Sequence, residues 1–318
     1  MVLEILLLVA GLLLLIKGAD WLVENSSAFA RKKRISELAI GLTIVAFGTS
    51  APELVVNVVA AYQGHEDIVF GNVIGSNNFN LLFILGVAGL ISPLLVQKTT
   101  VWKEIPISLL AAVILFFLVN DFFVDQQGTL GRWDALVLIL FFLAFLFYVY
   151  KQLKSEPSTA REVVPSSSNL KIFGFIILGL AGLIIGGRLV VDSAMEIAAN
   201  LGVSEKIIGV TIVAAGTSLP ELATSVIAAF KKNNDIAVGN IVGSNIFNIF
   251  FILGISSMVK PINYSAAFNT DLYLLFGGTT LLFLFMFLGG KRSLERWEAG
   301  ILLLIYIFYT TFLVLKEV

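Results

Sequence analysis

One stretch of this 318-residue chain occurs twice, and it limits the possible folds more than any other feature. Residues 40–86 align without a gap to residues 208–254, with 28 identical positions among the 47 compared. Such repeats reveal architecture that local patterns miss. Within an otherwise apolar segment, each copy carries one carboxylate directly after a proline, Glu53 or Glu221. We therefore expect two similar halves whose common function lies at this pair of glutamates.

The composition is that of a membrane protein. Hydrophobic residues make up 58 % of the chain, charged residues 14 %, and the mean hydropathy is +0.95. This hydropathy makes membrane lipid the expected surrounding. Lys and Arg (21) nearly balance Asp and Glu (22), so no nucleic-acid partner is expected. The absence of cysteine excludes disulfides, thiolate metal sites and a cysteine nucleophile. Glu4 replaces the basic start of a signal peptide, which favours a retained first helix.

Apolar stretches long enough to span a bilayer fall into two groups of five. They lie near 2–29, 37–62, 68–91, 103–123, 131–151, 170–199, 205–230, 236–259, 268–288 and 295–316. The fold class predicted is an all-α integral membrane protein with ten transmembrane helices in two repeats. We expect one repeat at residues 1–151, a second at 170–318, and a polar linker at 152–169.

An odd number of helices per half makes the two halves enter the membrane from opposite sides. Basic residues favour the cytoplasmic loops. Loops on the side reached after the first helix hold fifteen Lys and Arg, and the opposite side holds four: Arg132, Lys206, Lys260 and Lys316. We therefore expect a cell-membrane protein with both termini extracellular and the linker cytoplasmic. Inverted repeats of this kind are typical of secondary transporters, whose substrate site lies at the midplane between the halves.

The segments GTSAPE (48–53) and GTSLPE (216–221) predict broken helices. Proline donates no backbone hydrogen bond and displaces the carbonyl four residues earlier. Carbonyls of Ala46 to Thr49 and of Ala214 to Thr217 would be freed, and at membrane depth they need new partners. A bound cation can supply that partner.

The side chains around these breaks offer only oxygen. On helical spacing, Thr49 and Ser50 lie on the face of Glu53, and the second half repeats this arrangement with Thr217, Ser218 and Glu221. The next helices pair Ser76 with Asn80 and Ser244 with Asn248. Oxygen donors with two carboxylates suit a hard divalent cation, Ca²⁺ in particular, and no histidine or cysteine nearby favours zinc or copper. An ionisable residue inside the membrane is a functional site by default.

The residues also bear on two other classes of membrane protein, a protease and a cation channel. An intramembrane protease needs a Ser–His pair or two facing aspartates, and the single histidine, His65, falls in a predicted loop. We therefore expect no enzyme activity and no cofactor. A cation channel could use a two-glutamate constriction, but inverted repeats favour a transporter. Because the paired halves already enclose a site, a monomer is expected to function.

The motifs G-T-S-x-P-E and G-N-x-x-G-S-N-x-F-N, present in both halves, resemble those of the calcium/cation antiporters, and of the prokaryotic sodium/calcium exchangers among them. The resemblance spans the whole chain. It implies Na⁺/Ca²⁺ exchange by alternating access, with Ca²⁺ between Glu53 and Glu221 and backbone oxygens of Thr49 and Thr217. It also implies Na⁺ sites built by the following groups: the Ala46 carbonyl and Ser50 with Ser218 and Ser244; the Ala214 carbonyl, Thr217 and Ser76; and Asn80 lining the middle.

One position departs from the family pattern. Well-studied members carry aspartate where this chain has Asn248, so the formal charge of the site is −2 instead of −3. Family members that couple Ca²⁺ to protons usually have glutamate at the fifth position of the second motif, where this chain has Gly75 and Gly243. Ca²⁺/H⁺ antiport is therefore the second choice.

Overall fold

A computed structural model describes residues 2–120, 128–155, 168–201, 214–288 and 292–317. In these ranges the regular secondary structure is helical apart from four two-residue strands. Eight helices are long and apolar enough to cross a membrane, and a ninth span results if the bent pair Glu37–Thr49 and Ala51–Gln63 is counted as one. The prediction of an all-α, multi-pass membrane protein is confirmed. The expected span at 205–230 is described only from Ala214 onward, and residues 156–167 of the expected linker lie outside the described residues.

The elements follow the expected spans closely. In the first half they are α1 (Val2–Lys33), α2 (Glu37–Ile40), η1 (Gly41–Val45), α3 (Ala46–Thr49), α4 (Ala51–Gln63), α5 (Glu66–Asn78), η2 (Phe79–Ile84), α6 (Leu85–Ile91), β1 (Leu94–Leu95), η3 (Thr100–Glu104), α7 (Ile105–Val119), β2 (Thr129–Leu130) and α8 (Arg132–Ser155). In the second half they are α9 (Asn169–Asn200), α11 (Ala214–Gly216), α12 (Leu219–Phe230), α13 (Asn234–Ile246), η5 (Phe247–Leu253), α14 (Gly254–Val259), β3 (Ile262–Asn263), η6 (Ala266–Phe268), α15 (Asn269–Phe285), β4 (Ser293–Leu294) and α16 (Arg296–Glu317).

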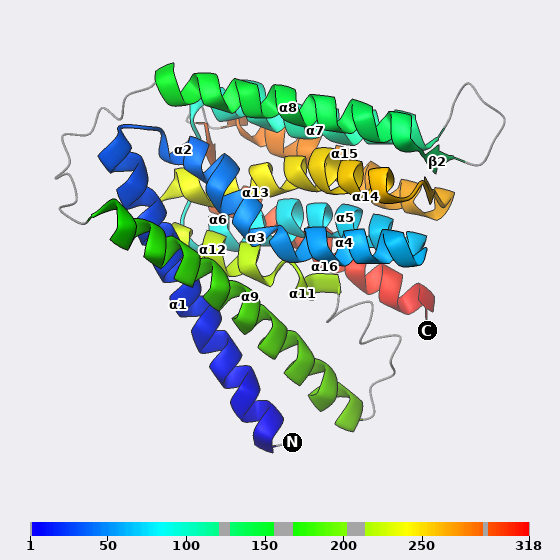
Figure 1. Ribbon diagram of the computed structural model, residues 1–318, viewed down its shortest axis with the longest axis horizontal. Helices are drawn as coiled ribbons and strands as arrows, with labels where there is room; N and C mark the ends of the chain where they lie inside the picture. Colours follow the sequence, from blue (N-terminus) through cyan, green and yellow to red (C-terminus); the bar gives the residue numbers. More distant parts are fainter. Residues whose placement is uncertain (1, 121–127, 156–167, 202–213, 289–291, 318) are drawn as a thin grey trace.

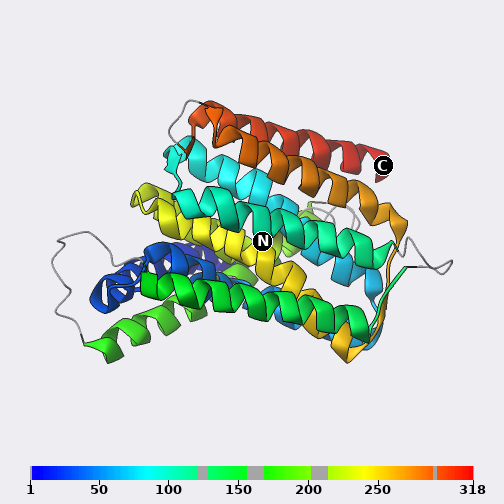
Figure 2. The ribbon, with the colours of Figure 1, turned by 90° about the horizontal axis from the view of Figure 1, so that it is seen from above.

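The centre of the molecule is formed by the helices that carry the Ser-Asn motifs. In α13–η5–α14, 94 % of the most apolar window is buried, and in α5–η2–α6 the share is 72 %. The corresponding shares are 22 % for α1 and 17 % for α16. A lipid environment explains why the outer helices expose large apolar side chains such as Leu140 and Phe308. The long helices of this core run alongside one another in both views (Figures 1 and 2).

Two short ladders join the two halves of the chain. Strand β1 pairs antiparallel with β4, placing Leu94 opposite Leu294. Strand β2 pairs antiparallel with β3, placing Leu130 opposite Ile262. Each ladder therefore links a loop of the first half to a loop of the second.

Helices α1 and α9 form a separate slanting pair, blue and green at the lower edge of Figure 1. Glycines allow their backbones to touch. A Cβ built on Gly18 would lie 2.7 Å from the Gly179 carbonyl oxygen, and one built on Gly186 would lie 2.8 Å from the Gly11 carbonyl oxygen. Small residues at such a crossing let membrane helices pack at backbone distance. The pair therefore packs backbone against backbone at its crossing.

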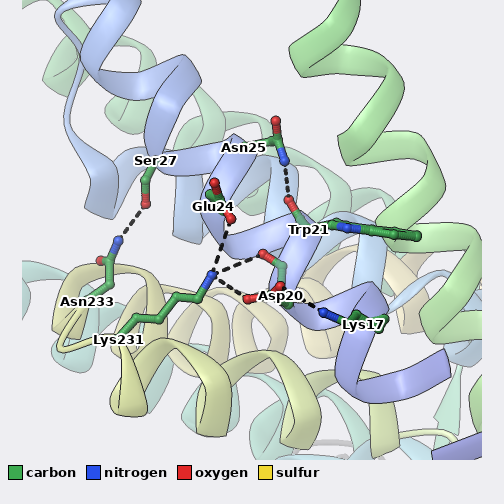
Figure 3. Close-up of polar contacts among 8 residues, drawn as sticks. All are labelled: Lys17, Asp20, Trp21, Glu24, Asn25, Ser27, Lys231 and Asn233. Atoms are coloured by element: carbon green, nitrogen blue, oxygen red, sulfur yellow. Dashed lines mark hydrogen bonds and ion pairs between the residues drawn. The ribbon is translucent and has the colours of Figure 1, made fainter. Parts of the chain in front are cut away.

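Polar side chains tie the end of α1 to the turn between α12 and α13 (Figure 3). The Lys231 ammonium lies 2.5 Å from an Asp20 carboxylate oxygen and 3.7 Å from one of Glu24. Asn233 donates to Ser27 Oγ at 2.6 Å, and its own side-chain oxygen accepts from the Ile236 amide at the start of α13. One turn thereby caps α13 and anchors α1.

Candidate cation site between the two halves

The two G-T-S-x-P-E motifs each break a helix at their serine. Helix α3 ends at Thr49 and α4 begins at Ala51, and Ser50 between them has φ −83° and ψ 9°. Ser218 takes nearly the same backbone angles before α12, φ −89° and ψ 8°. The prolines sit in the first turn of the new helices, where a missing N–H costs no hydrogen bond. The predicted interruption is confirmed, and it lies two residues before each proline.

The breaks turn each serine toward the carboxylate of the opposite half. Ser50 Oγ donates to Glu221 Oε1 at 2.8 Å, and Ser218 Oγ donates to Glu53 Oε1 at 3.2 Å. Both glutamates are 1 % exposed. Sequence spacing had placed each serine with the glutamate of its own half, but regular helical spacing does not continue through a break. The site is therefore crossed between the halves.

The serines of the second motif complete these contacts. Ser244 Oγ lies 3.0 Å from Ser50 Oγ and 3.4 Å from Glu221 Oε1. Ser76 Oγ lies 2.9 Å from Ser218 Oγ. Every one of these hydroxyls is buried. The four serines and two glutamates thus form two equivalent buried groups, Ser50 with Glu221 and Ser244, and Ser218 with Glu53 and Ser76, which together make up the cluster.

The threonines bind asparagines that were not assigned to the site from sequence. Thr49 Oγ1 donates to Asn240 Oδ1 at 3.0 Å, and Thr217 Oγ1 donates to Asn72 Oδ1 at the same distance. The expectation that the break frees the Ala46 carbonyl is wrong, because this carbonyl accepts from the Ser50 amide at 3.0 Å and from the Thr49 hydroxyl at 3.3 Å. Ala214 opens α11, one turn before Ser218.

Two further asparagines, Asn77 and Asn245, were missed by the sequence analysis. Each donates its side-chain amide to the other's backbone carbonyl at 3.2 Å. Their side-chain oxygens accept from Asn248 and Asn80 at 2.9 and 3.1 Å respectively. The signal was available, because both stand directly after the repeated serines of the second motif. These contacts hold the side-chain amides of Asn80 and Asn248 by their nitrogens. The side-chain oxygen of each amide is left without a partner.

Four buried oxygens of this cluster lack a hydrogen-bond partner. They are Oε2 of Glu53, Oε2 of Glu221, Oδ1 of Asn80 and Oδ1 of Asn248, two equivalent atoms from each half. A buried acceptor without a donor is costly, and a buried charge without a counter-charge is more so. The described residues hold no group of three or more His, Cys, Asp and Glu. A positively charged ligand bound through these four oxygens would satisfy them.

The two sides of the cluster differ in packing. Asn240 is fully buried, and its amide donates to Ser225 Oγ at 3.0 Å, whereas the equivalent Asn72 is partly exposed and its amide nitrogen lacks a partner. A cavity of about 250 Å³ lies beside Thr217, between α4, α9 and α12. Among the described residues, the contacts around Asn240 are therefore more complete than those around Asn72, and the cavity lies on the side of Thr217.

Comparison with known proteins agrees with this geometry. A family model described as sodium/calcium exchanger protein matches residues 3–151 and 171–315. This chain belongs to the sodium/calcium exchanger family. The sodium/calcium exchanger MaX1 of Methanosarcina acetivorans is 33 % identical over 97 % of both chains, and the inner membrane protein YrbG of Escherichia coli is 38 % identical over 82 % of this chain and 81 % of its own.

Solved structures lead to the same family. The sodium-calcium exchanger NCX_Mj, soaked with Na⁺ and Ca²⁺, superposes with a TM-score of 0.82 at 32 % identity, covering 97 % of each chain. Membership of the exchanger family makes this chain an ion transporter of the membrane. The resemblance inferred from the motifs is confirmed.

Proposed function

We propose that this chain exchanges Na⁺ for Ca²⁺ across the membrane, with both ions competing for the cluster around Glu53 and Glu221. The observation that carries this proposal is the set of four buried, unpartnered oxygens on two carboxylates and two amides. Ca²⁺ accepts six to eight oxygens in flexible geometry, and its charge balances two carboxylates. Hydroxyls and backbone carbonyls nearby would supply the remaining oxygens.

Na⁺ would use an overlapping set of atoms. We assign it to the hydroxyls of the four serines, the Thr217 side chain, and the carbonyls of Ala46 and Ala214, with the backbone oxygens of Thr49 and Thr217 beside Ca²⁺. The serine hydroxyls already contact the glutamates, so a Na⁺ ion among them would compete with Ca²⁺ for the same carboxylates. Overlapping ligands make the two ions bind in turn, as an exchanger requires.

We propose that the two halves are inverted and that access alternates between them. Three contacts of the cluster each occur twice, with both partners moved by 168 residues from one half to the other. They join Ser50 with Glu221, Ser50 with Ser244 and Thr49 with Asn240. The separate family-model matches in each half support the same division. With the orientation expected from the basic loops, the cavity beside Thr217 opens outward, and a sliding α1–α9 pair would reverse this.

The decisive experiment is ⁴⁵Ca²⁺ uptake into proteoliposomes containing the purified chain. An outward Na⁺ gradient should drive saturable uptake, and Glu53→Gln or Glu221→Gln should abolish it, since each removes one of two charges that balance Ca²⁺. Glu66→Gln is the matched control, because Glu66 lies outside the cluster and binds Asn263. Normal exchange in both site variants would refute the proposal. Uptake driven by a pH gradient alone would assign Ca²⁺/H⁺ antiport, and unsaturating current would indicate a channel.

A further inference from the structure

Another buried carboxylate, that of Glu104, lies outside the exchange cluster. Glu104, at the end of η3, is 0 % exposed inside a helix that is long and apolar enough to span the membrane. Within the described part of the chain, the hydrogen bonds of the exchange cluster involve neither α7 nor α8. An ionisable side chain inside a membrane helix is expensive and needs a partner or a function. The exchange mechanism gives Glu104 neither.

Glu104 belongs to a polar group of five residues between the start of η3 and α8: Thr99, Thr100, Glu104, Tyr148 and Gln152. Tyr148 of α8 donates its hydroxyl to Glu104 Oε1, and one turn further along α8, Gln152 donates to Thr99 Oγ1 at 3.4 Å. The two helices run in opposite directions, so Thr99 and Glu104 face Gln152 and Tyr148 respectively. The two contacts form adjacent rungs, one helical turn apart.

Three oxygens of this group have no hydrogen-bond partner. They are Glu104 Oε2, Thr100 Oγ1 and Gln152 Oε1, on side chains that are 0 %, 1 % and 6 % exposed. A proton on Glu104 would neutralise its charge, but its single O–H could donate to only one of the other two oxygens. A small cation held among them would satisfy all three together.

The charges and the backbone around Glu104 also favour a bound monovalent cation. The Lys103 ammonium acts on Glu104 only from a distance, because it lies over the Tyr148 ring, 5.2 Å from the centroid. A single carboxylate matches a monovalent ion, since a divalent one would leave a net charge in a low-dielectric site. The π-helical segments η2 and η5 carry Asn80 and Asn248 of the exchange cluster, and η3 has the same irregular backbone. Such segments are frequent at functional sites.

We propose that Glu104, Thr100 and Gln152 bind one Na⁺ ion at a second site, separate from the exchange cluster. The other half offers a useful contrast. Asp271 of α15 accepts from the Tyr309 hydroxyl at 2.5 Å, but neither of its oxygens is among the unpartnered buried atoms. The second site is therefore a feature of the first half, and Asp271 serves as a control.

The test measures thermal unfolding of the purified full-length chain that carries both Glu53→Gln and Glu221→Gln. Without the exchange carboxylates, NaCl should still raise the melting temperature relative to KCl or N-methylglucamine chloride at equal ionic strength, because a ligand of the folded state stabilises it. Adding Glu104→Gln should abolish this Na⁺-specific rise. Adding Asp271→Asn should preserve it.

The variant Thr100→Val distinguishes loss of Na⁺ binding from a general loss of stability. Removing an unsatisfied buried oxygen should leave the melting temperature without Na⁺ unchanged or higher, yet it should raise the half-saturating Na⁺ concentration about tenfold or more. An absent Na⁺-specific rise, an equal rise with K⁺, or a rise that survives Glu104→Gln would overturn the second site. Because transport is not measured here, failure of the exchange proposal would leave this result unaffected.

Discussion

Gly75 and Gly243 occupy the same position in the two copies of the second motif, yet the structure packs them differently. A Cβ added to Gly243 would lie 2.8 Å from the Ala46 Cβ and 3.0 Å from the Leu42 backbone. Among the described residues, a Cβ added to Gly75 would meet nothing within 4 Å. The pair of substitutions Gly243→Ala and Gly75→Ala therefore tests whether access is closed on one side and open on the other.

The magnitude follows from these distances. Carbon atoms pack best at about 3.5–4.0 Å, so a methyl on Gly243 would force a backbone to move. Overpacking of this kind costs about 1–3 kcal/mol. The gain in helix propensity from glycine to alanine, about 1 kcal/mol, is common to both variants and cancels in their difference. A difference near 2 kcal/mol corresponds to about a thirtyfold change in a conformational equilibrium.

Two assays measure the difference. Thermal unfolding should give a lower melting temperature for Gly243→Ala than for Gly75→Ala. Because the chain has no cysteine, a single Val56→Cys on the cavity wall can be labelled with a membrane-impermeant maleimide. Labelling should slow in the Gly243→Ala background and stay unchanged with Gly75→Ala. Equal melting temperatures together with equal labelling would refute the assignment of a packed and an open side.

Three further outcomes are expected. Asn245→Ala removes the acceptor that orients Asn80, so half-saturating Ca²⁺ in uptake assays should rise about tenfold or more; an unchanged value would contradict this. Asn233→Ala removes a helix cap and should cost about 1–2 kcal/mol in unfolding experiments, whereas Lys231→Gln should cost less than about 1 kcal/mol because its ion pairs are partly exposed and screened by salt; the reverse order would be inconsistent with the contacts. Asn248→Asp adds a third carboxylate, so Ca²⁺ uptake should depend more steeply on pH than in the parent chain, and superimposable pH profiles would argue against it.

Much of the architecture could be predicted before any coordinates were known. Ten apolar stretches predicted the observed elements to within a few residues wherever they are described, because spanning a membrane sets a minimum length of apolar helix. Glu53 and Glu221 stood out since a carboxylate in an apolar segment is rare and this one is repeated. Helix α1 exceeds its predicted end, continuing to Lys33, because basic residues favour the last turn of a helix.

The partners of these residues could not be predicted. Ser50 stands three residues before Glu53, and helical spacing joined the two, but the break at Ser50 redirects its hydroxyl to Glu221. Asn77 and Asn245 were part of a recognised motif, yet nothing in their spacing shows that they would bind each other across the halves. Contacts between segments about 168 residues apart depend on how the halves dock.

The sequence by itself determined a membrane protein of two related halves with one buried carboxylate in each, because hydrophobic length and repetition are properties of the chain alone. Only the tertiary structure decided how closely each half packs around the site. Gly75 and Gly243 are the same residue in the same motif, and among the described residues Gly243 touches backbone whereas Gly75 meets nothing within 4 Å. Nearly identical segments acquire different surroundings because a single chain adopts one conformation at a time, and that conformation does not share the symmetry of its sequence.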